Sequence, residues 1–379
     1  MKSKRFVLFA SCAPGLESVL HSEARDLKLS KVERQVGGIY FEGGIEDIWR
    51  ANLWLRTAVR IFLRVARFDA EDADKLYKGA ANVDWSDFIT PEGTLFVDAQ
   101  SKDSEVFHTH FIGQRVKDSV VDQFRHKTGV RPSVSVDKPD LRIHAHIYKD
   151  RATISVDTSG GSLHKRGWRK HQGIAPISET LAAAMVLLSG WNGRSPFIDP
   201  FSGSGTLAIE AGLIAANIAP GSWRKFGFES WPGHDAKAYA SFRSKELARE
   251  ARPLKLKIYG SDENPEQVTG AKQNAESAGL ADMIQFERRD AREFKTKPGW
   301  NAAIVTNPPY GIRVGDEREL QSLYRDFGQK LFEDCAGYQL SMILGNPELR
   351  PLLGLPSGRQ KDVQNGTIPC EFISVELGA

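Results

Sequence analysis

The stretch Ala-Ala-Ile-Val-Thr-Asn-Pro-Pro-Tyr-Gly, residues 302–311, decides the fold of this chain. Its first four residues are apolar, which is typical of a buried parallel strand. The two prolines that follow end the strand and fix an extended backbone. The result is a stiff arch at the carboxyl end of a strand, where ligands bind in open α/β sheets. The stretch therefore predicts an α/β domain with a ligand site at this arch.

The arch offers groups that can hold a planar amino group. The side-chain oxygen of Asn307 and the backbone carbonyl of Pro308 can together accept both hydrogens of an exocyclic NH2. The ring of Tyr310 can stack on the base that carries this amine. These three are therefore the predicted catalytic residues. On this motif alone, an ordinary asparagine before a Pro-Pro turn stays an open alternative.

A second motif lies upstream, where residues 196–206 read Pro-Phe-Ile-Asp-Pro-Phe-Ser-Gly-Ser-Gly-Thr. It predicts a strand, a glycine-rich turn and a following helix. Gly203 and Gly205 allow the backbone to approach a ligand closely, and a helix N-terminus favours a carboxylate or phosphate. The dinucleotide pattern lacks its third glycine here, and a P-loop lacks its Gly-Lys-Ser/Thr. The turn therefore predicts a cofactor site of another class.

Acidic residues near the ends of the predicted strands suit S-adenosylmethionine, which carries an amine, a carboxylate, a ribose and an adenine. Asp199 and Glu210 suit the amino group. Asp262 follows the second strand, where an acidic residue can bind ribose hydroxyls. Asp290 could accept a hydrogen bond from the adenine amine. Each acid alone can equally be a helix cap, but the series in chain order predicts a methyltransferase.

Residues 181–377 look like a class I S-adenosylmethionine methyltransferase domain. The whole chain resembles the bacterial THUMP-domain rRNA guanine-N2 methyltransferases, the family that includes the amino-terminal half of RlmL. Ser202 departs from the family, which more often has cysteine there, and no second methyltransferase domain follows. The matching stretches are residues 11–17, 51–58, 157–160, 163–169, 199–206 and 306–311. The cofactor-binding residues implied by the motifs and the resemblance are Asp199, Pro200, Gly203, Gly205, Thr206, Glu210, Asp262 and Asp290.

The resemblance divides the chain into four parts. Residues 1–57 are expected to form a ferredoxin-like segment, 58–157 a THUMP RNA-binding domain, 158–180 a basic linker and 181–379 the methyltransferase domain. The predicted fold class is therefore α/β, with a class I (Rossmann-like) S-adenosylmethionine methyltransferase domain behind a ferredoxin-like segment and a THUMP domain.

The segment before the methyltransferase domain is basic, because residues 158–178 contain no acidic side chain. Lys165, Arg166 and Arg169 can contact phosphates. Trp168 lies between them and can stack on an unpaired base. These four are the predicted RNA-binding residues, and a solvated linker is the alternative.

Composition fits a globular enzyme, with 41% hydrophobic and 26% charged residues. The net charge of +3 does not by itself indicate nucleic acid. No apolar run reaches the roughly 18 residues of a membrane helix. The 3 cysteines are far apart, so neither a zinc site nor a disulfide framework is predicted. A cytoplasmic enzyme without a metal is expected, and its oligomeric state stays open.

Three smaller features complete the interpretation. His144 and His146 share one strand face without a third ligand, which favours a polar outer face over a metal site. The insertion at residues 221–252 mixes aromatic and basic residues, so a packed flap and a nucleic-acid contact both stay open. Asn-Gly at residues 365–366 predicts a hairpin, although Pro369 should delay its second strand.

The same tetrapeptide Asn-Pro-Pro-Tyr serves adenine N6 in DNA and glutamine in proteins, but the THUMP-like front and Gly311 favour guanine in RNA. The predicted function is S-adenosylmethionine-dependent methylation of the exocyclic N2 amine of a guanine in 23S rRNA. The alternatives are a tRNA guanine-N2 methyltransferase of the same architecture and a non-catalytic RNA-binding ribosome assembly factor. No strong general base is required, because the amine proton becomes acidic once the nitrogen is alkylated.

Overall fold

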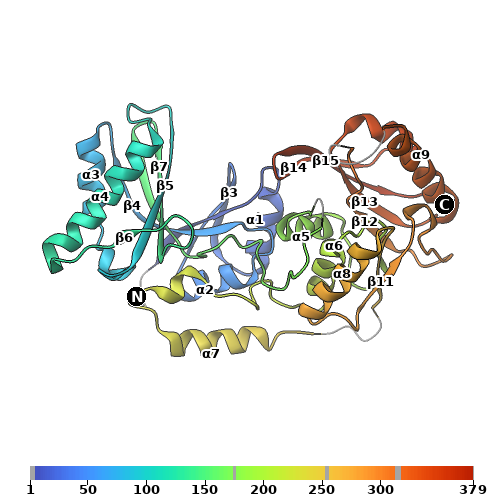
Figure 1. The fold of residues 1–379 in the computed structure, drawn as a ribbon, viewed down its shortest axis with the longest axis horizontal. Helices are drawn as coiled ribbons and strands as arrows, with labels where there is room; N and C mark the ends of the chain where they lie inside the picture. Colours follow the sequence, from blue (N-terminus) through green and yellow to red (C-terminus); the bar gives the residue numbers. More distant parts are fainter. Residues whose placement is uncertain (1–4, 174–175, 252–255, 312–316, 379) are drawn as a thin grey trace. The chain divides into compact units, whose positions relative to one another are not determined.

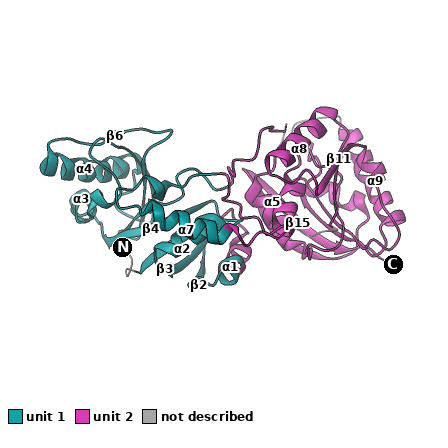
Figure 2. Cartoon of the chain, turned by 90° about the horizontal axis from the view of Figure 1, so that it is seen from below, with its two compact units in different colours: residues 1–11, 23–163, 224–246 teal, residues 12–22, 164–223, 247–379 magenta. Residues whose placement is uncertain are grey.

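The computed structural model describes residues 5–173, 176–251, 256–311 and 317–378. The chain divides into two compact units, which Figure 2 shows in teal and magenta. Unit 1 consists of residues 1–11, 23–163 and 224–246. Unit 2 consists of residues 12–22, 164–223 and 247–379. Each unit is built on one β-sheet.

Unit 1 contains an eight-stranded sheet in the order β2-β3-β1-β4-β8-β7-β5-β6. Strand β1 pairs antiparallel with β3 and with β4, and β4 continues antiparallel to β8. The expected ferredoxin-like and THUMP segments therefore share one continuous sheet. Its strands are β1 (Phe6–Ser11), β2 (Ser30–Gln35), β3 (Gly38–Gly43), β4 (Arg60–Asp69), β5 (Thr94–Lys102), β6 (Ser133–Val134), β7 (Leu141–Tyr148) and β8 (Arg151–Asp157).

Helices cover one face of this sheet. α2 packs on β3 and β4, α3 on β4, and α4 on β5 and β7. Side chains alternate along each strand, so Ile61 and Leu63 of β4 are buried while Phe62 and Arg64, which alternate with them, are partly exposed. The helices of the first 163 residues are α1 (Glu17–Asp26), α2 (Ile45–Trp54), α3 (Ala73–Ala81), the 3₁₀ turn η1 (Trp85–Asp87) and α4 (Thr109–Thr128).

The insertion after the first methyltransferase helix belongs to unit 1, through residues 224–246. It forms the 3₁₀ turn η2 (Gly227–Ser230) and most of α7 (Ala236–Leu247). The ring of Trp49 on α2 lies 5.3 Å from that of Tyr239 and 5.4 Å from that of Phe242, centroid to centroid. Trp231 is 4% exposed and packs edge-on against Phe88. The packed flap is therefore the correct alternative for these aromatic residues.

Unit 2 contains a seven-stranded sheet in the order β11-β10-β9-β12-β13-β15-β14. The first five strands are parallel, and β15 runs antiparallel to both β13 and β14. This is the expected class I methyltransferase sheet. Its strands are β9 (Phe197–Asp199), β10 (Ile258–Asp262), β11 (Ile284–Arg288), β12 (Ala303–Thr306), β13 (Gln339–Leu344), β14 (Arg359–Asn365) and β15 (Ile368–Glu376).

Helices flank the sheet of unit 2 (Figure 1). α6 packs with α5 and α8, whereas α9 forms a separate core with β12 and β13 through Tyr324, Phe327 and Leu331. The helices of this unit are α5 (Glu179–Leu188), α6 (Thr206–Ala215), α8 (Pro265–Ser277) and α9 (Glu317–Asp334), with the 3₁₀ turns η3 (Ala291–Glu293) and η4 (Pro347–Leu353).

The β14–β15 hairpin forms where the Asn-Gly pair predicts it, with Asn365 opposite Ile368. The expectation that Pro369 delays the second strand is wrong, since Pro369 pairs with Gln364. β13 pairs with β15 only from Glu371 onward, so the proline lies where that side of the strand is open. Across the described chain, no helix is long and apolar enough to span a membrane.

Candidate active site at the ends of β9, β10 and β12

The order of strands reverses at β9, which lies between β10 and β12. Ligands bind at such a switch point in open α/β sheets. Asp199 ends β9 and Thr306 ends β12. The Thr306 hydroxyl donates a hydrogen bond of 2.7 Å to Asp199 Oδ1. The residue that precedes the glycine-rich turn, Asp199, is therefore hydrogen-bonded to the residue that precedes the Asn-Pro-Pro-Tyr arch, Thr306.

Asp199 is 1% exposed, and its Oδ2 accepts no hydrogen bond from any described group. Burial raises the pKa of Asp199 to about 7, although hydrogen bonds from Thr306 and from the backbone of Phe201 act in the opposite direction. A buried carboxylate oxygen without a partner is costly unless a ligand supplies a donor or a positive charge. An amino group such as that of S-adenosylmethionine fits this oxygen.

The glycine-rich turn is tied to the end of β10. The backbone N–H of Gly203 donates to Asp262 Oδ2 at 2.9 Å, and that of Asn264 donates to Asp262 Oδ1 at 3.0 Å. Gly203 has a φ of +50°, and a Cβ there would meet nothing nearer than Gln267 Oε1 at 4.0 Å. The turn therefore leaves open space beside its backbone at Gly203.

Gly205 allows the turn to pack closely against neighbouring side chains and does not line open space. Its φ is +86°, and a Cβ there would lie 2.8 Å from the ring of Phe286 on β11 and 3.1 Å from the methyl group of Ala271 on α8. The absence of a side chain lets α6 begin close to the sheet. The two glycines of the motif thus have different roles, and the space for a ligand lies at Gly203.

Arg169 supports this turn from the preceding segment. Its Nε donates to Glu179 Oε1 at 2.7 Å. Its two terminal nitrogens donate to the Ser204 hydroxyl at 3.2 Å and the Thr206 hydroxyl at 2.9 Å. The guanidinium therefore joins the start of α5, the turn and the start of α6. Its prediction as an RNA contact is wrong in this structure, because its donors are used inside unit 2.

Asn274 on α8 gives a second support. Its Oδ1 accepts from the backbone N–H groups of Lys170 and His171, at 2.7 and 2.9 Å. Its Nδ2 donates to the carbonyls of His171 and Ser204, at 2.9 and 3.0 Å. The side chain is 0% exposed, so the segment around Lys170 is fixed to the turn and is not a free linker.

Arg166 and Trp168 are each 1% exposed, so the prediction that they contact RNA is wrong. Arg166 Nε lies 3.2 Å from Glu210 Oε1, and both side chains are buried. Glu210 Oε1 is occupied by this pair with Arg166, and the role of Glu210 as a cofactor ligand stays a prediction. Lys165 is exposed and remains a proposed RNA contact.

The Asn-Pro-Pro-Tyr arch is held by two tyrosines. The hydroxyl of Tyr324, on α9, donates to the Pro309 carbonyl at 3.0 Å. The Tyr310 hydroxyl donates to Asn307 Oδ1. Within the described residues, no group donates to the Pro308 carbonyl. One of the two predicted acceptors is thus open, and the other holds an internal hydroxyl.

The ring of Tyr310 is partly buried and lies against Gly345, where a Cβ would come within 2.4 Å of the ring. Burial raises the pKa of its hydroxyl, which stays protonated. A hollow of about 220 Å³ lies beside this ring. The residues that line it are Tyr310, Gly311, Glu317, Leu320, Gln321, Asn346, Glu348 and Leu349.

Asp290 caps η3 by accepting from the backbone N–H of Arg292 at 2.8 Å, and it also pairs with the Arg292 guanidinium. These hydrogen bonds lower the pKa of Asp290. The carboxyl is 26% exposed, so a contact with an adenine amine stays a proposal.

Sequence reasoning missed the supporting residues Thr306, Asn274 and Tyr324. Thr306 is inside the motif and could have been found there. Asn274 bonds to a residue 104 positions away, and Tyr324 to one 15 positions away. No local pattern signals either contact.

Three features define a class I S-adenosylmethionine-dependent methyltransferase: the strand order, the glycine-rich turn bonded to Asp262, and the arch strand bonded to Asp199 through Thr306. The description "RMKL-like, methyltransferase domain" matches residues 166–373, "THUMP domain" matches 70–157 and "RlmL ferredoxin-like domain" matches 7–62. The chain belongs to the RMKL-like methyltransferase family.

Relatives extend this similarity to the whole chain. The ribosomal RNA large subunit methyltransferase K/L of Syntrophotalea carbinolica is 39% identical over 97% of this chain and 53% of its own length. The chain thus spans about half the length of the curated relatives it matches. A putative methyltransferase designated SMU.472, solved in complex with SAH, superposes with a TM-score of 0.90 at 32% identity, covering 100% of this chain and 99% of that one. A possible methylase from Clostridium difficile 630 gives a TM-score of 0.90 at 32% identity, with 99% of each chain covered.

Proposed function

We propose that this protein transfers a methyl group from S-adenosylmethionine to the N2 amine of a guanine in large-subunit ribosomal RNA. The observation that carries the proposal is the hydrogen bond between Thr306 and Asp199, because it joins the residue just before the Asn-Pro-Pro-Tyr arch to the carboxylate proposed to bind the cofactor. The names of the curated relatives support ribosomal RNA as the substrate. The THUMP match supports RNA as the partner.

The cofactor fits the turn through groups that lack partners of their own. Asp199 Oδ2 is suited to the α-amino group, and the open side of Gly203 to the methionine portion. Asp262 keeps further lone pairs for ribose hydroxyls, because each oxygen accepts one backbone N–H. Pro200 and Thr206 border the turn on its two sides. When bound, the cofactor supplies an electrophilic methyl group.

The chain's own contribution is to orient the acceptor nitrogen and exclude water. The Pro308 carbonyl can accept one amine hydrogen directly. Asn307 Oδ1 can accept the other once the Tyr310 hydroxyl turns away from it. Two acceptors on one amine localise its lone pair on the side opposite the hydrogens. Target binding is therefore coupled to a rearrangement of Tyr310.

The hollow beside Tyr310 is suited to receive the target base. A base must leave its stack to reach this depth, which costs a few kcal/mol and least in an unpaired region. The Tyr310 ring borders the hollow, so it can stack on a base that enters. Asn346 adds a polar group at the same edge.

The test combines RNA mapping with reconstitution. Ribosomal RNA from a strain lacking the gene should miss one N2-methylguanosine in the large subunit. The purified chain with S-adenosylmethionine should restore it, while transfer RNA from the same strain should accept no methyl group. Restoration in transfer RNA alone would replace ribosomal RNA by the tRNA alternative. Labelling of neither RNA, by a chain that binds the cofactor, would contradict the proposed reaction.

A further inference from the structure

Five rings form a row across the face of the unit 1 sheet that lies opposite its helices. Tyr40 and Phe9 have ring centroids 4.9 Å apart, and Phe9 lies directly opposite Phe62 on β4. Phe62 lies 5.2 Å from His144, whose ring is 6.5 Å from that of His146 and within 10° of parallel to it. We call Tyr40, Phe9, Phe62, His144 and His146 the ring row.

Burial shows that this face reaches solvent. Leu8, Ala10 and Ile61, which alternate with the ring row along β1 and β4, are 0% exposed on the helix side. All five members of the ring row are partly exposed. A set of aromatic side chains on the outer face of a sheet is unusual for a monomer, because large apolar side chains are normally buried. The ring row is therefore a surface on which a ligand with flat rings can stack.

The charges around the ring row indicate the chemistry of that ligand. Arg64 and Arg67 follow Phe62 on the same strand, opposite Ser155 and Thr153 of β8. Those two residues lie opposite the histidines of the row, so the arginines share its face. Within the described chain, neither arginine forms an ion pair. The row is thus flanked by two positive charges that can meet phosphates.

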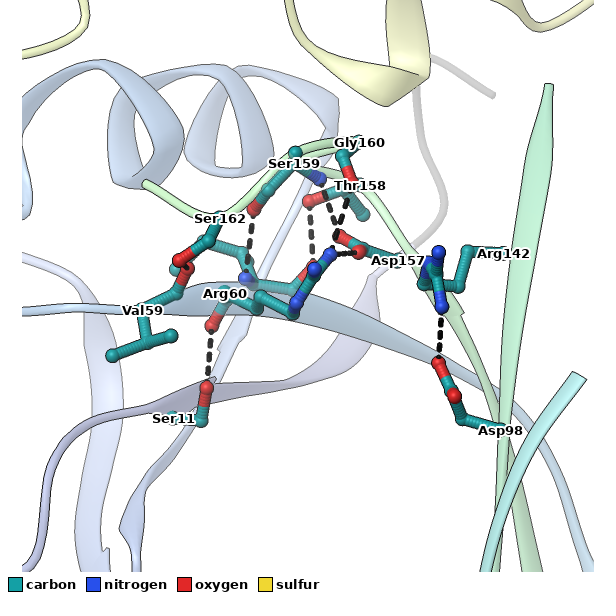
Figure 3. Close-up of polar contacts among 12 residues, drawn as sticks. Ser11, Val59, Arg60, Asp98, Arg142, Asp157, Thr158, Ser159, Gly160 and Ser162 are labelled. Atoms are coloured by element: carbon teal, nitrogen blue, oxygen red, sulfur yellow. Dashed lines mark hydrogen bonds and ion pairs between the residues drawn. The ribbon is translucent and has the colours of Figure 1, made fainter. Parts of the chain in front are cut away.

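Two neighbouring arginines have a different role. Arg60 pairs with Asp157 and donates to the Gly160 carbonyl at 2.9 Å, and Arg142 pairs with Asp98 at 2.6 Å (Figure 3). The charges of Arg60 and Arg142 are therefore neutralised within the protein, which leaves Arg64 and Arg67 as the arginines proposed to meet phosphates. Burial lowers the pKa of both His144 and His146, so their rings are neutral at neutral pH. Neutral rings are suited to stacking.

We propose that the ring row and its two unpaired arginines bind an unpaired segment of the RNA substrate, with bases stacked on the rings and phosphates beside Arg64 and Arg67. Stacking on aromatic side chains requires bases that are not already inside a helix, so duplex RNA does not fit this surface. The inference rests on the proposed RNA substrate and names the part of unit 1 that holds it.

The test measures binding of an unstructured RNA of about 10 nucleotides to the full chain by fluorescence anisotropy. Tyr40→Leu and Phe62→Leu keep apolar bulk and remove the aromatic face. Each should weaken binding by roughly 5- to 20-fold, from the known contribution of base stacking. Phe332→Leu is the matched control, because this phenylalanine is 87% exposed on α9, outside unit 1. It should bind like the unmodified chain.

The charge arm uses the salt dependence of binding. Arg64→Ser and Arg67→Ser should each reduce the slope of log affinity against log salt by about 0.7, the value for one single-strand phosphate contact. Arg34→Ser is the control, because Arg34 lies on the same sheet opposite buried Ile39, on the helix side. It should leave the slope unchanged. Melting temperatures verify that each variant is folded.

Three results would overturn the inference. The first is unchanged RNA affinity in both leucine variants. The second is a duplex of equal length that binds as well as the unpaired RNA and loses the same affinity in these variants. The third is an unmodified chain that does not bind the unpaired RNA. Methylation of ribosomal RNA, measured in parallel, tests the proposed reaction by itself, so a methylating enzyme with an inert ring row would lose only this inference.

Discussion

Replacing Asp199 by asparagine should stabilise the cofactor-free protein at pH 8. A carboxyl whose pKa rises from 3.8 to about 7 costs about 4 kcal/mol more to ionise in the fold than in the unfolded chain. Asparagine removes this cost and keeps an oxygen for the Thr306 hydroxyl. Its NH2 replaces the unpartnered Oδ2, and an unsatisfied donor costs about 1–3 kcal/mol. The expected net gain in the free energy of unfolding is roughly 1–3 kcal/mol.

The sign of the pH dependence follows from the raised pKa. Below about pH 4 the carboxyl of Asp199 is protonated in both the folded and unfolded chain, so it carries no ionisation cost. Between about pH 4 and 7 the unfolded chain ionises first, and the wild type loses stability relative to Asp199→Asn. Above pH 7 the difference should level off. Chemical unfolding across this range measures it.

The same substitution, Asp199→Asn, should weaken binding of the cofactor. A hydrogen bond to a charged group contributes about 1.5–3 kcal/mol, or roughly 10- to 150-fold in affinity. Calorimetric titration with S-adenosylmethionine at pH 8 gives this value. Asp137→Asn is the control, because that aspartate is exposed in unit 1. Wild-type cofactor affinity in a folded Asp199→Asn protein would refute the assignment of this carboxylate.

Three further predictions concern the turn and the arch. Arg169→Gln should weaken cofactor binding about 10-fold by freeing the turn, whereas Lys165→Gln should leave calorimetric affinity unchanged. Gly203→Val should abolish cofactor binding in a folded protein, because its side chain would enter the space for the ligand. Gly205→Ala should instead lower the melting temperature, because its Cβ would clash with core side chains. Tyr310→Phe should keep methylation within a few-fold of wild type, since stacking survives, and Tyr310→Leu should lose both target affinity and rate, measured by single-turnover labelling.

The local parts of the site could be predicted from the sequence. The strand, turn and helix around Asp199 follow from apolar runs and glycine spacing, and the arch follows from two prolines. The sheet order confirms the topology that these motifs implied. Strand β2 was missed, because its residues Ser30–Gln35 are mostly exposed and carry no apolar alternation.

The environment of single side chains could not be predicted in the same way. Arg166 and Trp168 stand in a basic stretch that looks solvated, yet the partner of Arg166 is 44 positions away at Glu210. Trp49 and the insertion that covers it are also far apart in sequence. Whether a charge faces RNA or a buried carboxylate depends on the tertiary fold, which composition does not contain. The residues of the ring row likewise lie on four different strands.

The central claim is that Asn307 and Pro308 hold the acceptor amine. Single-turnover methylation by Asn307→Ala, on ribosomal RNA from a strain lacking the gene, tests it most directly. The arch should persist, because the prolines and the Tyr324 hydroxyl hold it. Loss of an acceptor that acts in the transition state predicts a rate lower by about 2–4 kcal/mol, or roughly 30- to 1000-fold, with unchanged cofactor affinity. Methylation at the wild-type rate would contradict the account.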